Sequence, residues 1–264
     1  ILMTSVYLVV VLVRAWRWYI LVGEDMSLKQ SAVVVNIGYL MNTIWPFRVG
    51  EVARIELTRR SGEHSFGDSA ASLVVERLID LCFAVLFTII GLIFLPQHPE
   101  RLLDYIPVKP FIVSILFIST LGIVTSRHKI MAGGFRARLQ KIRQWHPILS
   151  TIWRHGEQFF GSLQRIRNSK RLIHTVSLSA LLWLLYLLYY QIGLQTFGVH
   201  SSSVGMGLLI VGFAALGIAA PSLPGAIGIF HAAVVLALSL HGQDVTLATS
   251  YAWLVWIPQT VVII

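Results

Sequence analysis

The chain has 264 residues, of which 56% are hydrophobic and only 12% are charged, and its mean hydropathy is +0.73. Soluble globular domains carry about 25% charged residues, so this composition excludes an ordinary soluble domain. The net charge of +9, from 21 Lys and Arg against 12 Asp and Glu, favours contact with an anionic membrane surface. The single cysteine, Cys82, excludes an intrachain disulfide. We therefore predict an all-α, polytopic transmembrane helical bundle in which residues 1–264 form one domain.

The first part of the chain contains three apolar runs, and two of them depart from a simple span. Residues 1–22 are long enough to cross a bilayer and end in side chains that suit the head-group boundary. The run 31–45 has only about 15 residues where roughly 20 are needed, and a polar stretch follows it to about Ser72. Residues 73–95 are long enough to span but contain three charged side chains. The boundary cluster of the first run consists of Arg14, Trp16, Arg17, Trp18 and Tyr19.

The middle of the chain combines a Pro-rich loop (96–110), an apolar run (111–126) and a basic block (127–171). The block holds nearly all of the net positive charge, so the positive-inside rule places it in the cytoplasm, with 96–110 outside and 46–72 inside. After Pro147 its apolar residues share one helical face, which favours an amphipathic helix on the inner leaflet. A soluble helical hairpin and a nucleic-acid patch are the alternatives. No nucleic-acid-binding fold or stacking motif accompanies the charge, so we expect no nucleic-acid partner.

The last part of the chain is apolar again. Residues 172–197 form a predicted span, and the run 204–220 is rich in Gly and Ala, which permits close helix packing in lipid. Proline and glycine residues stop that run. A short apolar run, 229–240, and a final span from about residue 246 complete the predicted elements.

Two short apolar runs end in the same pattern, a proline followed four residues later by a glycine. The first break runs from Pro46 to Gly50 and the second from Pro224 to Gly228. Irregular backbone is tolerated at membrane depth only where protein or a water-filled cavity surrounds it. Interrupted short segments in both halves are typical of transporter binding sites and are compatible with an inverted repeat. We therefore predict two re-entrant segments whose helix N-termini point into one mid-membrane cavity, with ordinary kinked spans as the alternative.

Charged residues inside the run 73–95 indicate a second constraint. Each ionised side chain at a bilayer centre costs about 2.5–3.5 kcal/mol on insertion scales. Glu76, Arg77 and Asp80 are tolerable inside a bundle, where helical spacings of three and four residues bring them together. Glu51 and Arg54, beside the first break, are their natural partners.

This charged cluster has two interpretations. The first is a set of ion pairs that only stabilises the fold. The second is a head-group site in which Arg48, Arg54 or Arg77 holds a phosphate, while Glu51 or Asp80 holds a cationic or hydroxylated group.

His231 follows the second break by three residues. A hydrogen-bonded core histidine is one interpretation, and a polar lining residue or proton carrier is the other. The chain contains no P-loop, dinucleotide fingerprint, Cys/His metal set or convincing nucleophile triad. We therefore predict no cofactor, no metal and no catalytic residues, and a chain closer to a transporter than to an enzyme.

Three motifs of the chain resemble the lysylphosphatidylglycerol synthase transmembrane-region family, also called flippase-like membrane proteins. They are Asn42-x-x-x-Pro46-x-Arg48-x-Gly50-Glu51-x-x-Arg54, Glu76-Arg77-x-x-Asp80 and Pro224-Gly225-x-x-Gly228. The resemblance implies a helical bundle with re-entrant segments, found alone or fused to a cytoplasmic aminoacyl-transferase or glycosyltransferase. It also implies movement of an aminoacylated or glycosylated lipid between leaflets.

We expect a lipid translocase of a prokaryotic plasma membrane that accepts an anionic or an aminoacylated or glycosylated lipid. The alternatives are a membrane-embedded subunit of a lipid-modifying transferase and a non-catalytic membrane scaffold. Expected partners are a membrane lipid and, in the transferase alternative, a cytoplasmic transferase; the sequence also allows a homo-oligomer. The predicted substrate-binding residues are Asn42, Arg48, Glu51, Arg54, Glu76, Arg77, Asp80, Gly225, Gly228 and His231.

Overall fold

The computed structural model describes residues 1–23, 25–62, 64–95, 158–159, 161–162, 170–199, 203–219 and 223–263. This part of the chain is helical and contains no strand, which confirms the predicted all-α class. The predicted loop 96–110, the predicted span 111–126 and most of the basic block 127–171 lie outside the described residues. The elements are α1 (Leu2–Val22), α2 (Leu28–Ile44), α3 (Val49–Ser61), α4 (Phe66–Ile93), α8 (Lys170–Thr196), α9 (Val204–Ala219), the 3₁₀ turn η1 (Pro224–Ala226), α10 (Ile229–Leu240) and α11 (Val245–Ile263).

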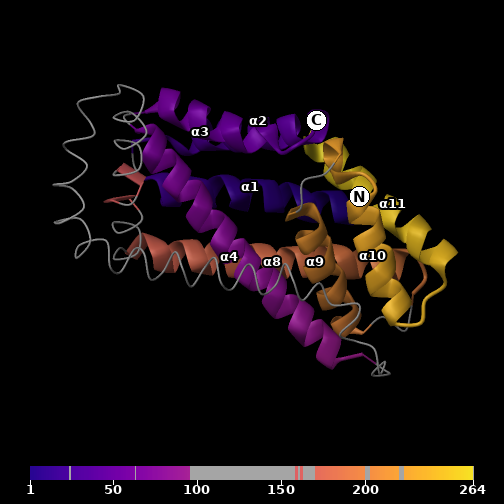
Figure 1. Ribbon diagram of the computed structural model, residues 1–264. Coiled ribbons are helices and arrows are strands. Elements are labelled where there is room, and N and C mark those ends of the chain that lie inside the picture. Colours follow the sequence, from indigo (N-terminus) through magenta and orange to yellow (C-terminus); the bar gives the residue numbers. More distant parts are fainter. Residues whose placement is uncertain are drawn as a thin grey trace, which may run out of the picture.

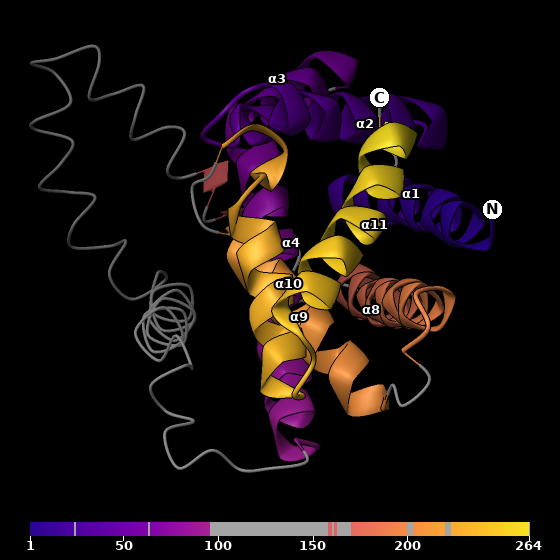
Figure 2. The same cartoon turned by 90° about the vertical axis from the view of Figure 1, so that its right-hand side faces the viewer.

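The helices form one bundle around α1. In Figure 1, α1 lies between α2 and α8, and α4 crosses this layer diagonally. Helix α9 packs along α4 and α10, and α11 closes the bundle beside α1 and α8 (Figures 1 and 2). Segments from both ends of the chain are therefore neighbours, because α11 and η1 both contact α2.

Three of the described helices, α1, α8 and α11, are long and apolar enough to cross a membrane. They correspond to the predicted spans 1–22, 172–197 and the run from about 246. Helix α4 is longer, at 28 residues, and carries the charged residues of the predicted span 73–95. Large apolar side chains such as Leu12, Ile93 and Leu184 are exposed on these helices, as lipid contact requires.

Two helices begin earlier than hydropathy alone predicts. Ser27 and Gln30 form a reciprocal capping box, so α2 begins at Leu28 rather than at residue 31. Ser65 and Asp68 form a second capping box, which starts α4 at Phe66, within the stretch expected to be polar and non-spanning. The capping side chains accept hydrogen bonds from backbone N–H groups at the helix start, and a hydropathy scale does not include this stabilisation.

Small residues allow α4 and α9 to pack closely, as the glycine-rich run 204–220 predicts. A Cβ atom added at Gly212 would lie 2.2 Å from Thr88 Oγ1, and one added at Gly91 would lie 2.6 Å from the backbone nitrogen of Leu209. The two backbones therefore approach too closely for any larger side chain at these crossings.

The predicted head-group boundary cluster on α1 is wrong for three of its members. Arg14, Arg17 and Trp18 are buried, whereas Trp16 is half exposed. Helical periodicity explains the difference, because positions 14, 17 and 18 continue the inward face that includes Tyr7. Two arginines thereby point into the bundle rather than toward lipid head groups.

Candidate functional site

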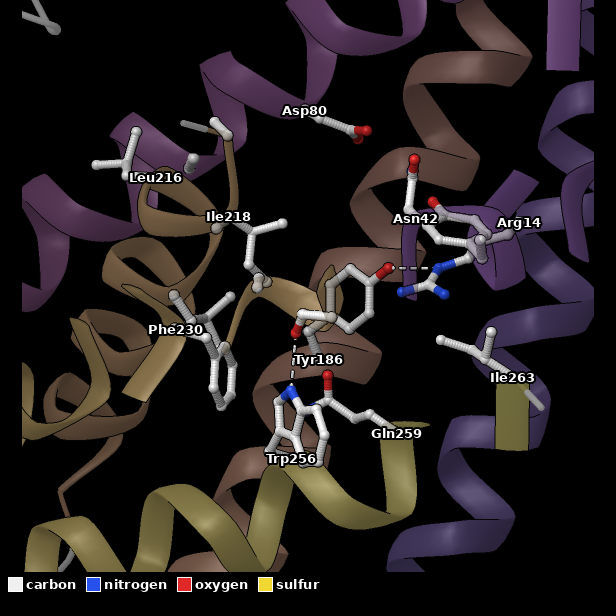
Figure 3. Close-up of a pocket in the computed structure, with 18 of the residues that line it drawn as sticks. Arg14, Asn42, Asp80, Tyr186, Leu216, Ile218, Phe230, Trp256, Gln259 and Ile263 are labelled. Atoms are coloured by element: carbon white, nitrogen blue, oxygen red, sulfur yellow. Dashed lines mark hydrogen bonds between the residues drawn. The ribbon is translucent and has the colours of Figure 1, made fainter. Parts of the chain in front are cut away.

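A cavity of about 490 Å³ lies where α1, α2, α4 and α8 meet the C-terminal helices. Figure 3 shows Arg14 and Asn42 on one side of it, Trp256 and Gln259 along another edge, and Tyr186 between them. Apolar walls come from α9 and α10, including Val211, Leu216, Ile218 and Phe230. The polar and aromatic lining residues are Tyr7, Arg14, Tyr39, Asn42, Thr43, Arg48, Glu51, Arg77, Asp80, Trp183, Tyr186, Tyr190, Trp256, Gln259 and Thr260.

The first break turns the chain into this cavity. Phe47 and Arg48 adopt left-handed backbone conformations, with φ of 59° and 57°, which reverse the direction between α2 and α3. The Arg48 side chain forms an ion pair with Glu51 and donates to the carbonyls of Ile218, at 3.3 Å, and Ala219, at 3.1 Å. An arginine at the C-terminal carbonyls of α9 is stabilising, so Arg48 links the first break to the helix that precedes the second.

Gly50 serves close packing rather than an unusual backbone angle. A Cβ atom at this position would lie 1.8 Å from the Gly38 carbonyl oxygen, so α2 and α3 cross through two glycines. Its amide donates to Asn42 Oδ1 at 2.8 Å. The contact positions α3 so that Arg54 passes beside Gly38 toward the bundle interior.

The second break reaches the same cavity. Gly225 and Ala226 have φ of 64° and 56° within η1, and the Gly225 carbonyl accepts a hydrogen bond from Trp256 Nε1 at 2.9 Å (Figure 3). A Cβ at Gly225 would lie 3.8 Å from the Thr43 carbonyl oxygen. The two breaks are therefore neighbours, whereas two independent kinks would not need to meet.

Behind the cavity lies a buried ion pair. Arg54 donates two hydrogen bonds to Glu76, Nη1 to Oε1 and Nη2 to Oε2, each at 3.0 Å, and both side chains are 2% exposed. This fork-to-fork geometry is the strongest arrangement of arginine and carboxylate. Neither residue lines the cavity.

The other carboxylates each bridge two arginines. Asp80 accepts hydrogen bonds from Arg17 at 2.5 and 3.0 Å and lies 3.7 Å from Arg77. Glu51 pairs with Arg48 and, at 3.0 Å, with Arg77. The predicted partnership of the first-break residues with the charged run of α4 is thus confirmed, and Arg17 is an additional member that the sequence interpretation placed elsewhere.

Arg14 is the exception among the buried arginines. Its guanidinium carbon lies 4.3 Å from the centre of the Tyr39 ring, 5.2 Å from that of Tyr7 and 5.4 Å from that of Tyr186. Its Nε donates to the Tyr186 hydroxyl at 2.8 Å, while the buried Nη1 has no partner among the described residues. Arg14 forms no ion pair with any described carboxylate, although it lines the cavity and is only 9% exposed.

The site therefore carries excess positive charge. Its five arginines, Arg14, Arg17, Arg48, Arg54 and Arg77, face three carboxylates, Glu51, Glu76 and Asp80. Two positive charges remain uncompensated within the described residues. Buried charges are normally paired, so this excess favours an anionic ligand.

The model of the lysylphosphatidylglycerol synthase TM region matches residues 1–264, the whole chain. The chain belongs to this family. Neither the curated proteins nor the solved structures provide a match. As a member of this family the chain is a membrane-embedded protein with a lipid-related function.

The three motifs that resemble this family lie around the same cavity in the structure. Asn42, Arg48 and Glu51 from the first motif and Arg77 and Asp80 from the second all line the cavity. In the third motif, Gly225 lines the cavity, whereas Gly228, which was also predicted to bind the ligand, is not among the lining residues.

His231 does not line the cavity, contrary to its interpretation as a polar lining residue. Its ring centre lies 4.1 Å from that of Trp253 and 5.8 Å from that of Trp256. The helix turn that directs Phe230 toward the cavity directs the next residue away from it. Its two ring nitrogens have no partner among the described residues, so it is not the hydrogen-bonded core histidine of the other interpretation either.

No group of three His, Cys, Asp or Glu side chains in the described ranges is placed to hold a metal ion. Arginine, tyrosine, tryptophan and amide groups dominate the polar lining instead. Such groups bind and orient an anionic ligand; they do not form a nucleophile and base pair.

Proposed function

We propose that this family member binds the anionic head group of a membrane lipid in the cavity and moves it between leaflets. The observation that carries the proposal is Arg14, a buried cavity-lining guanidinium without a carboxylate partner. Leaving a buried charge unpaired is costly, and a phosphate that binds beside the Arg14 guanidinium would compensate that charge. The apolar walls of α9 and α10 suit a ligand whose remaining part is hydrocarbon.

The two broken segments are central to this proposal. They would re-enter the bilayer as parts of an inverted repeat, so that the irregular backbone at Arg48 and Gly225 surrounds a head-group path. The N-terminus of α3 lies at the cavity, where its helix dipole would add to the attraction for a phosphate. Lipid tails would remain in the bilayer while the head group passes.

The cellular setting forms part of the same proposal. We place the protein in a prokaryotic plasma membrane with the basic block 127–171 facing the cytoplasm. A cytoplasmic lipid-modifying transferase would supply the lipid, and a homo-oligomer is compatible with the apolar outer surface of the bundle.

Reconstitution into phosphatidylcholine vesicles that contain a trace of acyl-labelled fluorescent phosphatidylglycerol tests the proposal. Dithionite bleaches only the outer leaflet, so protein-dependent loss of the protected fraction measures lipid movement. We expect Arg14→Gln to slow this movement about tenfold, the effect of one lost charge-assisted hydrogen bond.

The matched control is Arg60→Gln, which removes the same charge from a side chain that is 71% exposed. It should move lipid at the wild-type rate. Wild-type protein that is folded but leaves the protected fraction unchanged would refute translocation. Equal rates for wild type and Arg14→Gln would refute the role of Arg14.

A further inference from the structure

The polar groups that the cavity offers to a ligand are mainly hydrogen-bond donors. Arg14 Nη1 is a donor without a partner among the described residues. Asn42 uses its Oδ1 to accept from Gly50, so the part of its amide left for a ligand is the NH₂ donor. Both residues line the cavity, from the neighbouring helices α1 and α2, so this side of the cavity is rich in hydrogen-bond donors.

Two tyrosine hydroxyls are arranged in the same way. Tyr186 Oη accepts from Arg14 Nε at 2.8 Å, and Tyr190 Oη accepts from Gln259 Nε2 at 3.3 Å. Each hydroxyl therefore keeps its proton for donation to another group. Trp183 also lines the cavity, and its indole N–H has no partner in the part of the chain that is described.

The negatively charged acceptors of the cavity, in contrast, already have partners. Glu51 and Asp80 are the carboxylates among the described lining residues, and each contacts two arginines. Three of the aromatic rings of the lining, those of Tyr7, Tyr39 and Tyr186, already hold a cation, because the Arg14 guanidinium lies among them. A cationic head group would therefore meet net positive charge and no available carboxylate.

We infer that the cavity selects a phospholipid whose head group beyond the phosphate is neutral and hydroxylated, and that it rejects an aminoacylated, cationic head group. The inference rests on the proposed function for its site. The phosphate would accept from Arg14, and hydroxyl or ether oxygens would accept from Asn42, Tyr186 and Tyr190. This donor-rich lining distinguishes phosphatidylglycerol from its lysylated form, because lysine adds an ammonium group that needs an acceptor.

The test compares phosphatidylglycerol with lysyl-phosphatidylglycerol in two measurements on the full chain. Native mass spectrometry of the detergent-purified protein, with each lipid added in turn, measures binding. The dithionite assay, with each lipid acyl-labelled in phosphatidylcholine vesicles, measures movement. We expect phosphatidylglycerol to bind at least about tenfold more tightly and to move correspondingly faster, the discrimination expected from one unpaired buried charge.

Asn42→Asp sharpens the test, because Asp is nearly isosteric and still accepts from the Gly50 amide. It replaces the NH₂ donor by an additional carboxylate oxygen in the cavity. We expect it to weaken phosphatidylglycerol binding and to strengthen lysyl-phosphatidylglycerol binding, so that the preference narrows or reverses. Asn36→Asp, on the same helix but outside the cavity lining, is the matched control and should keep the wild-type preference.

The outcomes separate this inference from the proposed function. Equal or tighter binding of lysyl-phosphatidylglycerol by wild-type protein overturns the inference, even where both lipids move. Preferential binding of phosphatidylglycerol without movement of either lipid supports the inference and overturns translocation. An unchanged preference in folded Asn42→Asp, judged by its unfolding temperature, overturns the assignment of the donor lining.

Discussion

Arg54 and Arg14 are two buried arginines in one bundle, and they differ in their partners and in their position relative to the cavity. Both guanidinium groups lie over aromatic rings and share Tyr39 as a neighbour, at 6.0 and 4.3 Å from its ring centre. Arg54 has a carboxylate, Glu76, in bidentate contact, whereas Arg14 has a hydroxyl and an unpartnered Nη1. Arg54 lies behind the cavity wall, and Arg14 lies in it.

The difference separates two roles of a buried charge in a membrane protein, stabilising the fold and binding a ligand. A paired arginine is part of the fold, because removing either partner leaves the other charge uncompensated. An arginine that the protein itself leaves without a carboxylate is available to an incoming anion. The charged cluster contains both kinds of residue: a structural half, Arg54 and Glu76, lies behind the cavity, and a cavity-facing half, which includes Glu51, Arg77 and Asp80, lines it.

The largest expected effect is on the structural half. Glu76→Gln leaves Arg54 buried without its counter-charge, so we expect the free energy of unfolding to fall by about 3–5 kcal/mol. Thermal unfolding in detergent, followed by tryptophan fluorescence, measures the loss. The control Glu56→Gln removes a carboxylate that pairs with exposed arginines and should lower the unfolding temperature far less. Similar unfolding temperatures for the two variants would contradict the comparison.

The next effect concerns the crossing that positions Arg54. Gly50→Ala places a Cβ 1.8 Å from the Gly38 carbonyl oxygen, which forces α2 and α3 apart. We expect a destabilisation of about 1–3 kcal/mol, typical of overpacking, in the same unfolding assay. Gly217→Ala, whose new Cβ would lie 3.1 Å from the Ala233 Cβ, should have the milder effect. The reverse order would mean that α2 and α3 do not depend on this close approach.

Arg14→Gln should change stability less than either variant. It leaves no carboxylate without a partner, and the fold loses the hydrogen bond to Tyr186 and the cation–π contact with the tyrosine rings, the latter worth about 0.5–2 kcal/mol. Lipid movement should nevertheless fall strongly. An Arg14→Gln variant as unstable as Glu76→Gln would place Arg14 in the structural half and remove the comparison on which the proposed site depends.

The smallest effect is a pH dependence at the exposed surface. Hydrogen bonds from Arg59 and Arg60 lower the pKa of Glu56 from 4.5 to about 2. A lowered folded-state pKa contributes stability above the unfolded pKa, and this contribution disappears as the pH falls from about 4.5 toward 2. The difference in unfolding temperature between wild type and Glu56→Gln should therefore be constant from neutral pH to about pH 5 and shrink below it. A difference that grows on acidification would contradict this assignment.

Several elements could be predicted because their signals are local. Apolar length identified the spans 1–22 and 172–197, and the spacing of Glu76, Arg77 and Asp80 identified a charged face on one helix. The helix starts at Leu28 and Phe66 were missed, although Ser27 and Ser65 followed three residues later by Gln and Asp are readable capping signals.

The candidate site was predicted only in part. Hydropathy placed Arg14 and Arg17 at the head-group boundary because basic and aromatic residues cluster there, and the burial of Val10 and Tyr7 on the same helical face is the signal that would have corrected it. The cavity role expected of His231 failed for a similar reason. A single residue shift along a helix changes the direction of a side chain by about 100°, which proximity in sequence does not resolve.

By itself the sequence determined the membrane class, the helical architecture, the two Pro/Gly breaks and the residues able to carry charge inside the bundle. Only the tertiary structure decided which of those charges neutralise one another. An ion pair depends on the helix that lies opposite, and α1 brings Arg17 to Asp80 while α3 brings Arg54 to Glu76. Once these partners are assigned, Arg14 is the buried arginine that lines the cavity without a described carboxylate, and no local pattern could have identified it.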